Sequence, residues 1–282
     1  MRLQPRLFRI RIDGLRRAAL LGVSAVLVGS CDRPPLTWRE TVRKPNAPSA
    51  GWRLLVDGRG TPALDAAPTA PFVAPTGACP SSIVFASAGG GNWFTAWWQP
   101  RADSSARLMV SRSTNAGQSW TAPVAAESRD TAPLGCARPN PALAADSAAG
   151  VVHLAYFIAL SRGSGVWYAQ SRDQGATWPN PVGVFYGDDP AHADVAARRD
   201  TVIVAYEYPN ADDGRVGVAL SYDAGHEFTV RMPVSPGTER ASDPRVALGG
   251  GVVAVGWTSG DATGGHGGAF TVVDVAPLGA GK

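Results

Sequence analysis

After Gly51 the sequence consists of short apolar runs, which glycine, proline, aspartate and serine interrupt every few residues. No stretch in this part of the sequence sustains the 3.6-residue period of an amphipathic helix. Four of the runs are alike, because each contains a small residue followed by an aromatic one. They span residues 92–98, 151–157, 201–207 and 251–257. Short strands bounded by turn residues are typical of an all-β domain.

The aromatic residues of these four runs recur at nearly constant spacing. They are Trp97, Tyr156, Tyr206 and Trp257, which are 59, 50 and 51 residues apart. A further apolar run precedes each of them and another follows, so each unit contains up to four short strands. Such a unit cannot bury both faces of its sheet alone, and stacked neighbours supply the missing cover. The recurrence of the aromatics at one position favours core packing over sugar stacking.

Units of about 50 residues with four strands each are typical of the blades of a β-propeller. We therefore predict an all-β fold, a β-propeller of four-stranded antiparallel blades, with four blades. A five-bladed propeller and a partial six-bladed ring stay open as alternatives. Gly51–Gly58 is an unassigned strand that can pair with the last blade and close the ring, and Thr61–Pro75 can add part of a fifth unit.

An octet with the pattern Ser-x-Asp/Asn-x-Gly-x-x-aromatic follows the third strand of the first three units. It occurs at Ser113–Trp120, Ser171–Trp178 and Ser221–Phe228, and the copies start 58 and 50 residues apart. The Asp or Asn side chain can accept bonds from the backbone of its own turn, and the glycine can take a positive φ. The aromatic residue can pack back between sheets. We expect each octet to hold together the outer turn of one blade.

The octets resemble the Asp-box, or BNR, repeats of sialidases and related β-propellers. The resemblance covers residues 83–275, and the last unit has no octet. It implies that the octets lie on the rim away from the active-site face and mark the fold without implying hydrolysis. Sialidases of this kind have six blades, and this chain is too short for six of its own units. The residues to which the resemblance gives a structural role are Asn115, Gly117, Trp120, Asp173, Gly175, Trp178, Asp223, Gly225 and Phe228.

The first thirty residues look like an export signal, because six arginines precede an apolar run too short to span a bilayer. The run ends at Val28–Cys31, which resembles the bacterial lipobox and implies cleavage before Cys31 and lipidation of its thiol. Residues 1–30 are then a signal peptide, residues 31–50 a Pro-rich tether, and residues 51–282 the propeller domain. The expected location is the bacterial cell envelope, facing the periplasm or the exterior. An ordinary signal peptide or a short membrane anchor is the alternative.

Removal of the signal changes the charge of the chain. The whole sequence has a net charge of +3, but residues 1–30 hold six of its 26 basic residues and one of its 23 acidic residues. The mature chain therefore has 20 basic and 22 acidic residues, a net charge of −2, and no basic run. Nucleic acid is not an expected partner. Membrane contact is expected through the lipid anchor alone.

Cysteine usage agrees with export. Lipidation of Cys31 leaves Cys79 and Cys136, each a few residues ahead of the first strand of its blade. An oxidising envelope permits a disulfide between them. The sequence has no CxxC motif and no Cys/His cluster, and its four histidines are scattered, so neither a metal nor a cofactor is expected.

Catalytic residues cannot be assigned by motif. The sialidase family uses an arginine triad, a tyrosine nucleophile with a glutamate partner, and an aspartate acid/base, but its Phe/Tyr-Arg-Ile-Pro motif is absent from the mature chain. Loops that leave second strands and enter first strands share one face of a propeller. This loop face offers Glu207, Tyr208 and Asp194 as catalytic candidates. It also carries arginines that predict an anionic ligand, since guanidinium grips carboxylates bidentately. They are Arg101, Arg138, Arg162, Arg215, Arg240 and Arg245.

Three functions are compatible with these features. The first is a lipid-anchored, sialidase-like propeller that binds a glycan or an envelope protein as a binding or scaffold module. The second is a glycoside hydrolase of the exo-α-sialidase type. The third is a partial propeller that a partner or a second copy completes. The missing arginine motif favours the first, and the sequence leaves open whether the chain is an enzyme.

Overall fold

The computed structural model describes residues 36–43, 51–147, 149–210 and 214–260 in full, and residues 44 and 266–274 by their backbone. Within these residues the regular elements are eighteen β-strands and one turn of 3-10 helix, Pro80–Ser82. None of the described elements is a helix that could cross a membrane. The predicted signal peptide, residues 1–30, and the predicted lipidation site, Cys31, lie outside the described residues.

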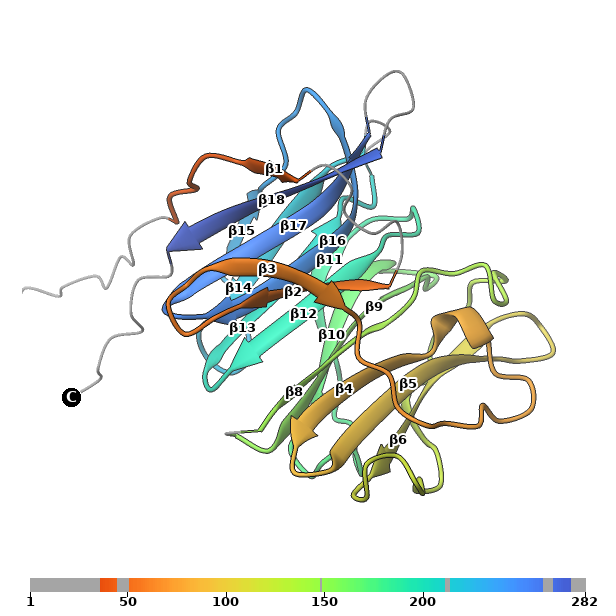
Figure 1. Cartoon of the computed structure of the whole chain (residues 1–282). Helices are drawn as coiled ribbons and strands as arrows, with labels where there is room; N and C mark the ends of the chain where they lie inside the picture. Colours follow the sequence, from red (N-terminus) through yellow and green to blue (C-terminus); the bar gives the residue numbers. More distant parts are fainter. Residues whose placement is uncertain (1–35, 45–50, 148, 211–213, 261–265, 275–282) are drawn as a thin grey trace, which may run out of the picture. The chain divides into compact units, whose positions relative to one another are not determined.

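Four antiparallel sheets of four strands each form the blades of a β-propeller, as predicted from the repeats (Figure 1). Blade 1 contains β4 (Val84–Gly89), β5 (Asn92–Pro100), β6 (Ala106–Ser113) and β7 (Val124–Glu127). Blade 2 contains β8 (Ala142–Asp146), β9 (Val151–Ile158), β10 (Gly165–Ser171) and β11 (Val182–Tyr186). Blade 3 contains β12 (Ala193–Arg198), β13 (Thr201–Glu207), β14 (Val216–Ser221) and β15 (Val230–Pro233). The first strands β4, β8 and β12 pack side by side in this order.

Blade 4 takes its outer strand from the other end of the sequence. It contains β16 (Arg240–Gly249), β17 (Val252–Gly260), β18 (His266–Asp274) and β1 (Val42–Lys44), with Val42 opposite Phe270. Leu36 and Trp38, just before β1, pack against the core between blades 3 and 4. The stretch expected to be an extended tether therefore includes a strand, which pairs with an edge of β18 that would otherwise expose its N–H and C=O groups.

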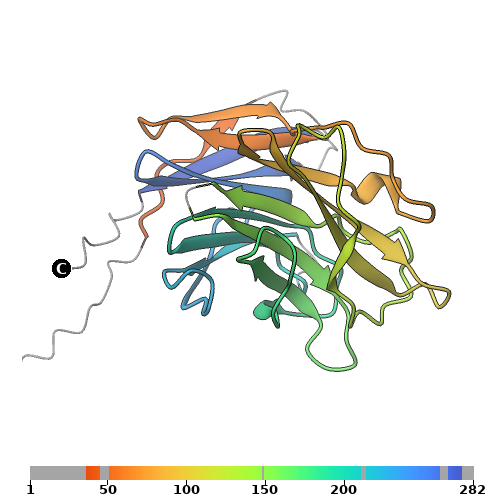
Figure 2. The same ribbon diagram turned by 90° about the horizontal axis from the view of Figure 1, so that it is seen from below.

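The strand predicted at Gly51–Gly58 does not pair with the last blade. It is β2 (Trp52–Val56), and it forms a two-stranded hairpin with β3 (Pro62–Ala66). The Asp57 carboxylate explains this pairing, because it accepts the backbone N–H groups of Arg59 and Thr61 in the connecting turn. The hairpin packs beside β16 and β17 of blade 4 and has half the strands of a blade (Figures 1 and 2).

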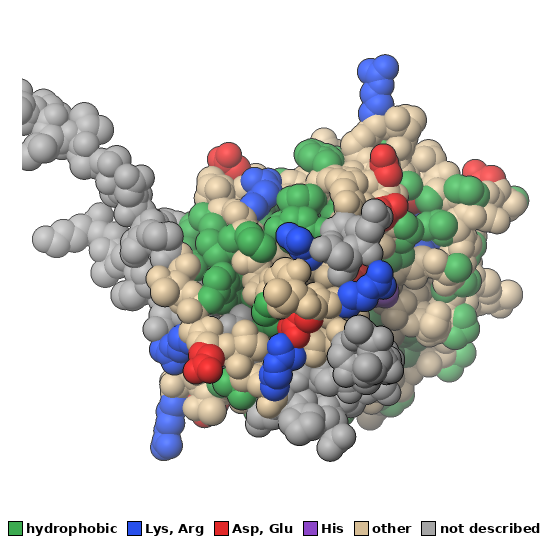
Figure 3. All heavy atoms as spheres, turned by 90° about the horizontal axis from the view of Figure 1, so that it is seen from above, with side chains coloured by type: hydrophobic (Ala, Val, Ile, Leu, Met, Phe, Trp, Pro, Cys, Tyr) green, Lys and Arg blue, Asp and Glu red, His purple; other side chains and the backbone are tan. Residues whose placement is uncertain are grey.

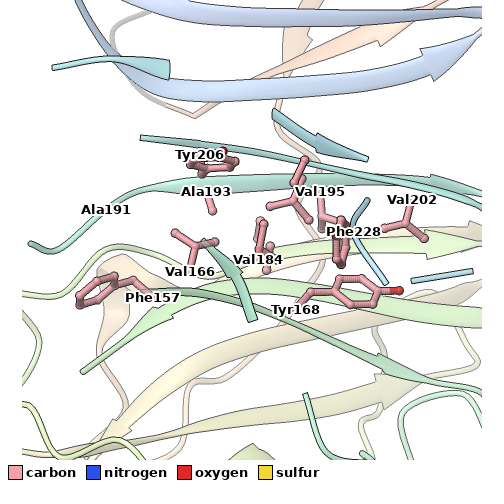
Figure 4. Close-up of a cluster of buried hydrophobic side chains, with 14 residues drawn as sticks. Phe157, Val166, Tyr168, Val184, Ala191, Ala193, Val195, Val202, Tyr206 and Phe228 are labelled. Atoms are coloured by element: carbon pink, nitrogen blue, oxygen red, sulfur yellow. The ribbon is translucent and has the colours of Figure 1, made fainter. Parts of the chain in front are cut away.

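The hydrophobic core lies between neighbouring sheets. The four recurring aromatics are at most 1% exposed, which agrees with the core packing that their spacing predicted. Figure 4 shows the cluster between blades 2 and 3, where valines and alanines of β12 meet the aromatic side chains of blade 2. There the rings of Tyr168 and Phe228 meet edge to face, with centroids 5.3 Å apart. Small residues on β12 leave room for these rings, so the two sheets pack closely.

The three octets connect the third and fourth strands of blades 1, 2 and 3, and each closes its turn with the same bonds. In the second octet, the Ser171 hydroxyl donates to Asp173 at 2.6 Å and accepts the Gly175 N–H at 2.7 Å. The Asp173 carboxylate also accepts the Thr177 N–H at 2.9 Å. These bonds, above all the one from Ser171, lower the pKa of Asp173 to about 2. Equivalent bonds hold the octets that begin at Ser113 and Ser221.

The octet of blade 3 also fixes the contact with blade 2. Gly225 has a φ of +84°, and a Cβ there would come within 2.4 Å of the Tyr168 ring. Phe228, at the end of the same octet, is 1% exposed and packs on that ring. Between blades 1 and 2 the link is covalent, because Cys79 and Cys136 form a disulfide with their Cα atoms 5.4 Å apart.

Candidate functional site

Two of the six predicted ligand-binding arginines are used inside the protein. The Arg138 side chain is 1% exposed and pairs with Asp130 at 2.9 Å. Its other nitrogens donate to the carbonyls of Gly135 and Ala132, and its guanidinium lies 4.9 Å from the Trp98 ring. A buried ion pair with its donors satisfied offers no group to a ligand. Arg138 is therefore a structural residue, contrary to the binding role predicted for it.

Arg101 belongs to the same network as Arg138. Its guanidinium donates to the Ser105 hydroxyl and to the carbonyls of Ala106 and Asp130. The Asp130 carboxylate in turn accepts the N–H groups of Ala106, in blade 1, and Ala159, just after β9 of blade 2. The network holds the two blades together, which accounts for both arginines without a ligand.

Three more of these arginines are exposed and lie on separate loops or strand ends. Arg162 lies in the loop between β9 and β10, and Arg215 directly precedes β14. Arg240 is the first residue of β16. The Arg215 guanidinium lies near Gly237, and the Cβ of Arg240 lies near Gly214. These two arginines therefore flank the loops where blade 3 meets blade 4.

The sixth arginine, Arg245, lies in a group of charged side chains that we call the blade 3–4 cluster. The cluster consists of His192, Asp194, Glu207, Asp243 and Arg245. It was only partly predicted from the sequence, which named three of its members as site candidates. His192 and Asp243 could be recognised only as polar residues of loops on the same face.

Arg245 is fixed from three directions within this cluster. Its guanidinium pairs with the Asp243 carboxylate at 2.8 Å and donates to the Trp52 carbonyl at 2.9 Å. The same guanidinium lies 5.4 Å from the Trp52 ring, whose N–H donates to Asp243 at 3.2 Å. The side chains of Arg245 and Asp243 stay 20% and 30% exposed. The hairpin thus positions Arg245. The sequence did not predict this contribution, because the unassigned strand could also pair with the last blade.

Glu207 joins blade 3 to blade 4. One of its oxygens accepts the His192 backbone N–H at 2.8 Å and lies 3.1 Å from Nδ1 of the same residue. The other oxygen accepts the backbone N–H of Asp243 at 2.7 Å. Both oxygens are therefore bonded, while the His192 side chain remains 47% exposed.

The backbone at Asp243 adopts an unusual conformation to make this contact. Its φ is +53°, in the left-handed region that residues other than glycine seldom occupy. The register of β16 against β17 shifts between Ser242 and Arg245, so Asp243 lies in a β-bulge. Bulges of this kind redirect side chains and are frequent next to functional sites. Here the bulge aims the Asp243 N–H at Glu207 while its carboxylate meets Arg245.

The contacts of the cluster shift its ionisation equilibria in different directions. The bond to Glu207 raises the pKa of His192, although burial opposes this. Burial alone would raise the pKa of Glu207, but the bonds from His192 and the two backbone N–H groups outweigh it and lower that pKa. Burial raises the pKa of Asp194, which accepts the Val246 N–H at 2.8 Å, against the opposing charge of Arg245. Three carboxyl groups thus surround one guanidinium and one imidazole.

Tyr208 points away from Glu207, because successive side chains of an extended chain lie on opposite faces. Its ring packs against Phe185 and Tyr206, with centroids 5.0 and 5.4 Å away. Burial raises its pKa above the ordinary value. Tyr208 and Glu207 therefore face away from each other, and the structure separates these two catalytic candidates.

Charges on the surface are mixed. Figure 3 shows a face on which acidic and basic side chains are interspersed with hydrophobic and uncharged ones. No group of three or more His, Cys, Asp or Glu side chains suited to a metal ion occurs in the described part of the chain. The blade 3–4 cluster is the candidate site, because its charged groups are fixed by their hydrogen bonds and ion pair and stay partly exposed.

Comparisons with known proteins add little beyond this geometry. No family model and no curated protein matches the sequence. Among solved structures, the Hadza microbial sialidase Hz136 is 20% identical over 67% of this chain and 43% of its own, with a TM-score of 0.49. A protein of unknown function from Dyadobacter fermentans is 16% identical over 66% of this chain and 50% of its own, with the same TM-score.

A sialidase from Trypanosoma rangeli is more distant, at 12% identity, with a TM-score of 0.43 over 66% of this chain and 30% of its own. This chain therefore spans half or less of the length of these three structures. Likenesses of this size carry no argument about activity, and the function is argued from the site.

Proposed function

We propose that this protein is a lipid-anchored β-propeller of the bacterial envelope that binds a glycan through the blade 3–4 cluster. The observation that carries the proposal is the fixed, partly exposed set of His192, Glu207, Asp243 and Arg245. Glu207 lies 3.1 Å from His192 Nδ1 and accepts the backbone N–H of Asp243 at 2.7 Å, and the Asp243 carboxylate pairs with Arg245 at 2.8 Å. Binding sites for small ligands typically hold a few precisely placed polar groups. Groups held before binding lose little conformational freedom when a ligand arrives.

The composition of the cluster favours a neutral glycan over an acidic one. Carboxylates accept hydrogen bonds, and this cluster has three carboxyl groups for one guanidinium. The Arg245 charge is already paired with Asp243. A ligand rich in hydroxyl donors suits such a site better than the anionic ligand that the arginines predicted.

Binding is favoured over hydrolysis because the carboxyl groups are committed. Glycosidases of the two-carboxylate type need one acid and one base or nucleophile that face the scissile bond. Both oxygens of Glu207 accept hydrogen bonds from protein groups, and one oxygen of Asp194 accepts the Val246 N–H. An exo-α-sialidase would also need an arginine triad, and Arg101 and Arg138 are bonded inside the protein.

The lipid anchor agrees with the position of the first described residues. Leu36 packs on the domain, and only five peptide units separate it from Cys31. Five residues span at most about 18 Å. Lipidation of Cys31 would therefore hold the propeller close to the membrane. A palmitate analogue should label the wild type and not Cys31→Ala, and equal labelling would contradict the anchor.

A second function is favoured by the hairpin, which has two strands where each blade has four. A partner or a second copy could supply the missing strands of this unit. Sedimentation equilibrium of the mature chain distinguishes the cases. A dimer that dissociates when residues of β3 are substituted would support completion by a second copy. A monomer at all concentrations would contradict completion by a second copy.

The glycan proposal is tested with the exported mature chain on an array of neutral and acidic oligosaccharides, alongside a fluorogenic sialoside. We expect neutral oligosaccharides to be retained and the sialoside to stay intact. Turnover of the sialoside would favour the hydrolase, and an array without any retained glycan would contradict the proposal.

A further inference from the structure

We propose that the Tyr186 ring is a stacking platform for a sugar and extends the blade 3–4 cluster into a binding surface for an oligosaccharide. The inference rests on the glycan-binding function proposed above. It assigns a role to an aromatic group that neither the fold nor the cluster explains, because Tyr186 is 58% exposed. Among the large hydrophobic residues of the described chain that are exposed, it is the aromatic one.

The ring of Tyr186 is held in place despite its exposure. It meets the Trp167 ring edge to face, with centroids 5.9 Å apart and planes at 82°. Its hydroxyl end lies against Gly183, where a Cβ would come within 2.3 Å of the oxygen. Gly163 lies against the same ring, since a Cβ at that position would be 3.6 Å from the ring carbon Cε1. The protein thus holds the ring at three places and still leaves the residue 58% exposed.

Trp167, the neighbour of Tyr186, is fixed in turn. Its indole N–H donates to the Gly163 carbonyl at 3.2 Å, and the Arg129 guanidinium lies 5.0 Å from its ring. Arg129 is held by Glu127 at 2.7 Å. Tyrosine, tryptophan and arginine are the residues most enriched at the centres of binding surfaces. A rigid aromatic pair of this kind loses little freedom when a ligand packs on it.

The platform and the cluster are connected by the same two loops, which is why we place them in one binding surface. The loop from Tyr186 to His192 is bonded to the loop from Glu207 to Asn210. The Asn210 amide donates to the Tyr186 carbonyl at 3.1 Å, and the Asp189 N–H donates to the Pro209 carbonyl at 2.8 Å. At the far end of these loops the His192 N–H donates to Glu207. Because Tyr186 and His192 lie at opposite ends of the loop between β11 and β12, we expect a ligand that bridges them to contain more than one sugar ring.

Carbohydrate chemistry matches both halves of this surface. The C–H face of a pyranose is weakly polar and packs on the negative face of an aromatic ring. The hydroxyls at its edge require acceptors and donors, which the blade 3–4 cluster provides. The platform therefore selects for a neutral oligosaccharide over a single sugar.

The test uses the exported mature chain on an array of neutral oligosaccharides and their matching monosaccharides. Tyr186→Ala should weaken retention of the oligosaccharides at least tenfold and leave any monosaccharide retention unchanged. Tyr186→Trp should restore the retention of the oligosaccharides. Val73→Ala is the matched control, because Val73 is 91% exposed and far from these loops in the sequence. All variants should melt at the temperature of the wild type.

The outcomes separate this inference from the function on which it rests. If the wild type retains oligosaccharides and Tyr186→Ala retains them equally well, the platform is overturned while glycan binding stands. If the wild type retains no glycan, the proposed function fails first. Equal losses of oligosaccharide and monosaccharide with Tyr186→Ala would also overturn the platform, since they indicate a general disturbance of the site.

Discussion

The Glu207 carboxylate at the end of β13 in blade 3 accepts the backbone N–H of Asp243 in blade 4 at 2.7 Å. This bond requires the left-handed backbone at Asp243, whose φ is +53°. Strained residues of this kind persist where surrounding contacts enforce them, and they cluster at functional sites. The contact therefore couples the position of His192, which also binds Glu207, to the bulge in β16.

Substitutions at Asp243 should separate backbone strain from side-chain contacts. Asp243→Ala should lower the free energy of unfolding by about 1–2 kcal/mol, because alanine fits the left-handed region poorly. Asp243→Asn should lower the free energy of unfolding by less, since asparagine tolerates that conformation and can keep the hydrogen bond from Trp52. Urea unfolding measures both variants. An alanine variant as stable as the asparagine variant would show that the backbone conformation is not enforced.

The octets should affect stability and leave ligand binding intact. Asp173→Ala removes an acceptor of three hydrogen bonds and should cost about 1 kcal/mol, because the carboxylate is exposed and water replaces part of what is lost. Since the folded pKa is about 2, the stabilisation is present above the unfolded value and is lost as pH falls toward 2. Thermal melts and glycan binding are measured on the same variant. Lost binding with an unchanged melt would contradict the structural role.

Gly225→Ala should be more damaging than the loss of a carboxylate. Its Cβ would come within 2.4 Å of the Tyr168 ring at a φ of +84°, so both packing and backbone oppose it. We expect a loss of about 2–4 kcal/mol in the free energy of unfolding. Gly58→Ala is the matched control, because nothing lies within 4 Å of a Cβ there. Equal stability of the two variants would mean that blade 3 does not contact blade 2 at Tyr168.

The contact between His192 and Glu207 should make stability depend on pH. The pKa of His192 is raised, so its contribution is complete below the unfolded value of 6.5 and is lost as pH rises through the folded value. The pKa of Glu207 is lowered, so its contribution is lost only as pH falls below its unfolded value of 4.5. Stability should therefore drop by less than about 1 kcal/mol between pH 5.5 and pH 8.5, since the imidazole is half exposed.

His192→Gln serves as the control for that pH dependence. It keeps a polar side chain but cannot titrate. The decrease in the free energy of unfolding between pH 5.5 and pH 8.5 should therefore be smaller by the contribution of His192. The same drop in wild type and variant would place the titrating group elsewhere.

The blades could be predicted from the sequence because their signals are local. Short apolar runs such as residues 201–207 coincide with strands, here β13, and the small–aromatic pairs lie where sheets pack. The closing strand β1 gave no such signal, because three residues in a Pro-rich, charged stretch show no period. The hairpin was not predicted, because its two strands have five residues each and its turn depends on hydrogen bonds to the Asp57 carboxylate.

The candidate site was harder to predict, because it depends on contacts between distant segments. Arg138 and Arg245 are both arginines near the start of a first strand, yet one pairs with buried Asp130 and the other lies beside Trp52. Nothing in the local sequence distinguishes them. The bulge at Asp243 is equally invisible, since the strand pattern continues on both sides of it.

The most direct test of the account is a calorimetric titration of the mature wild type, His192→Ala and Arg198→Ala with an oligosaccharide that the wild type retains on the array. His192 lies in the blade 3–4 cluster, whereas Arg198 is exposed at the other end of β12. The account predicts that His192→Ala weakens binding at least tenfold while it loses less than about 1 kcal/mol of stability, and that Arg198→Ala binds like the wild type. Wild-type affinity in His192→Ala, or an equal loss in Arg198→Ala, would contradict the assignment of the site to this cluster.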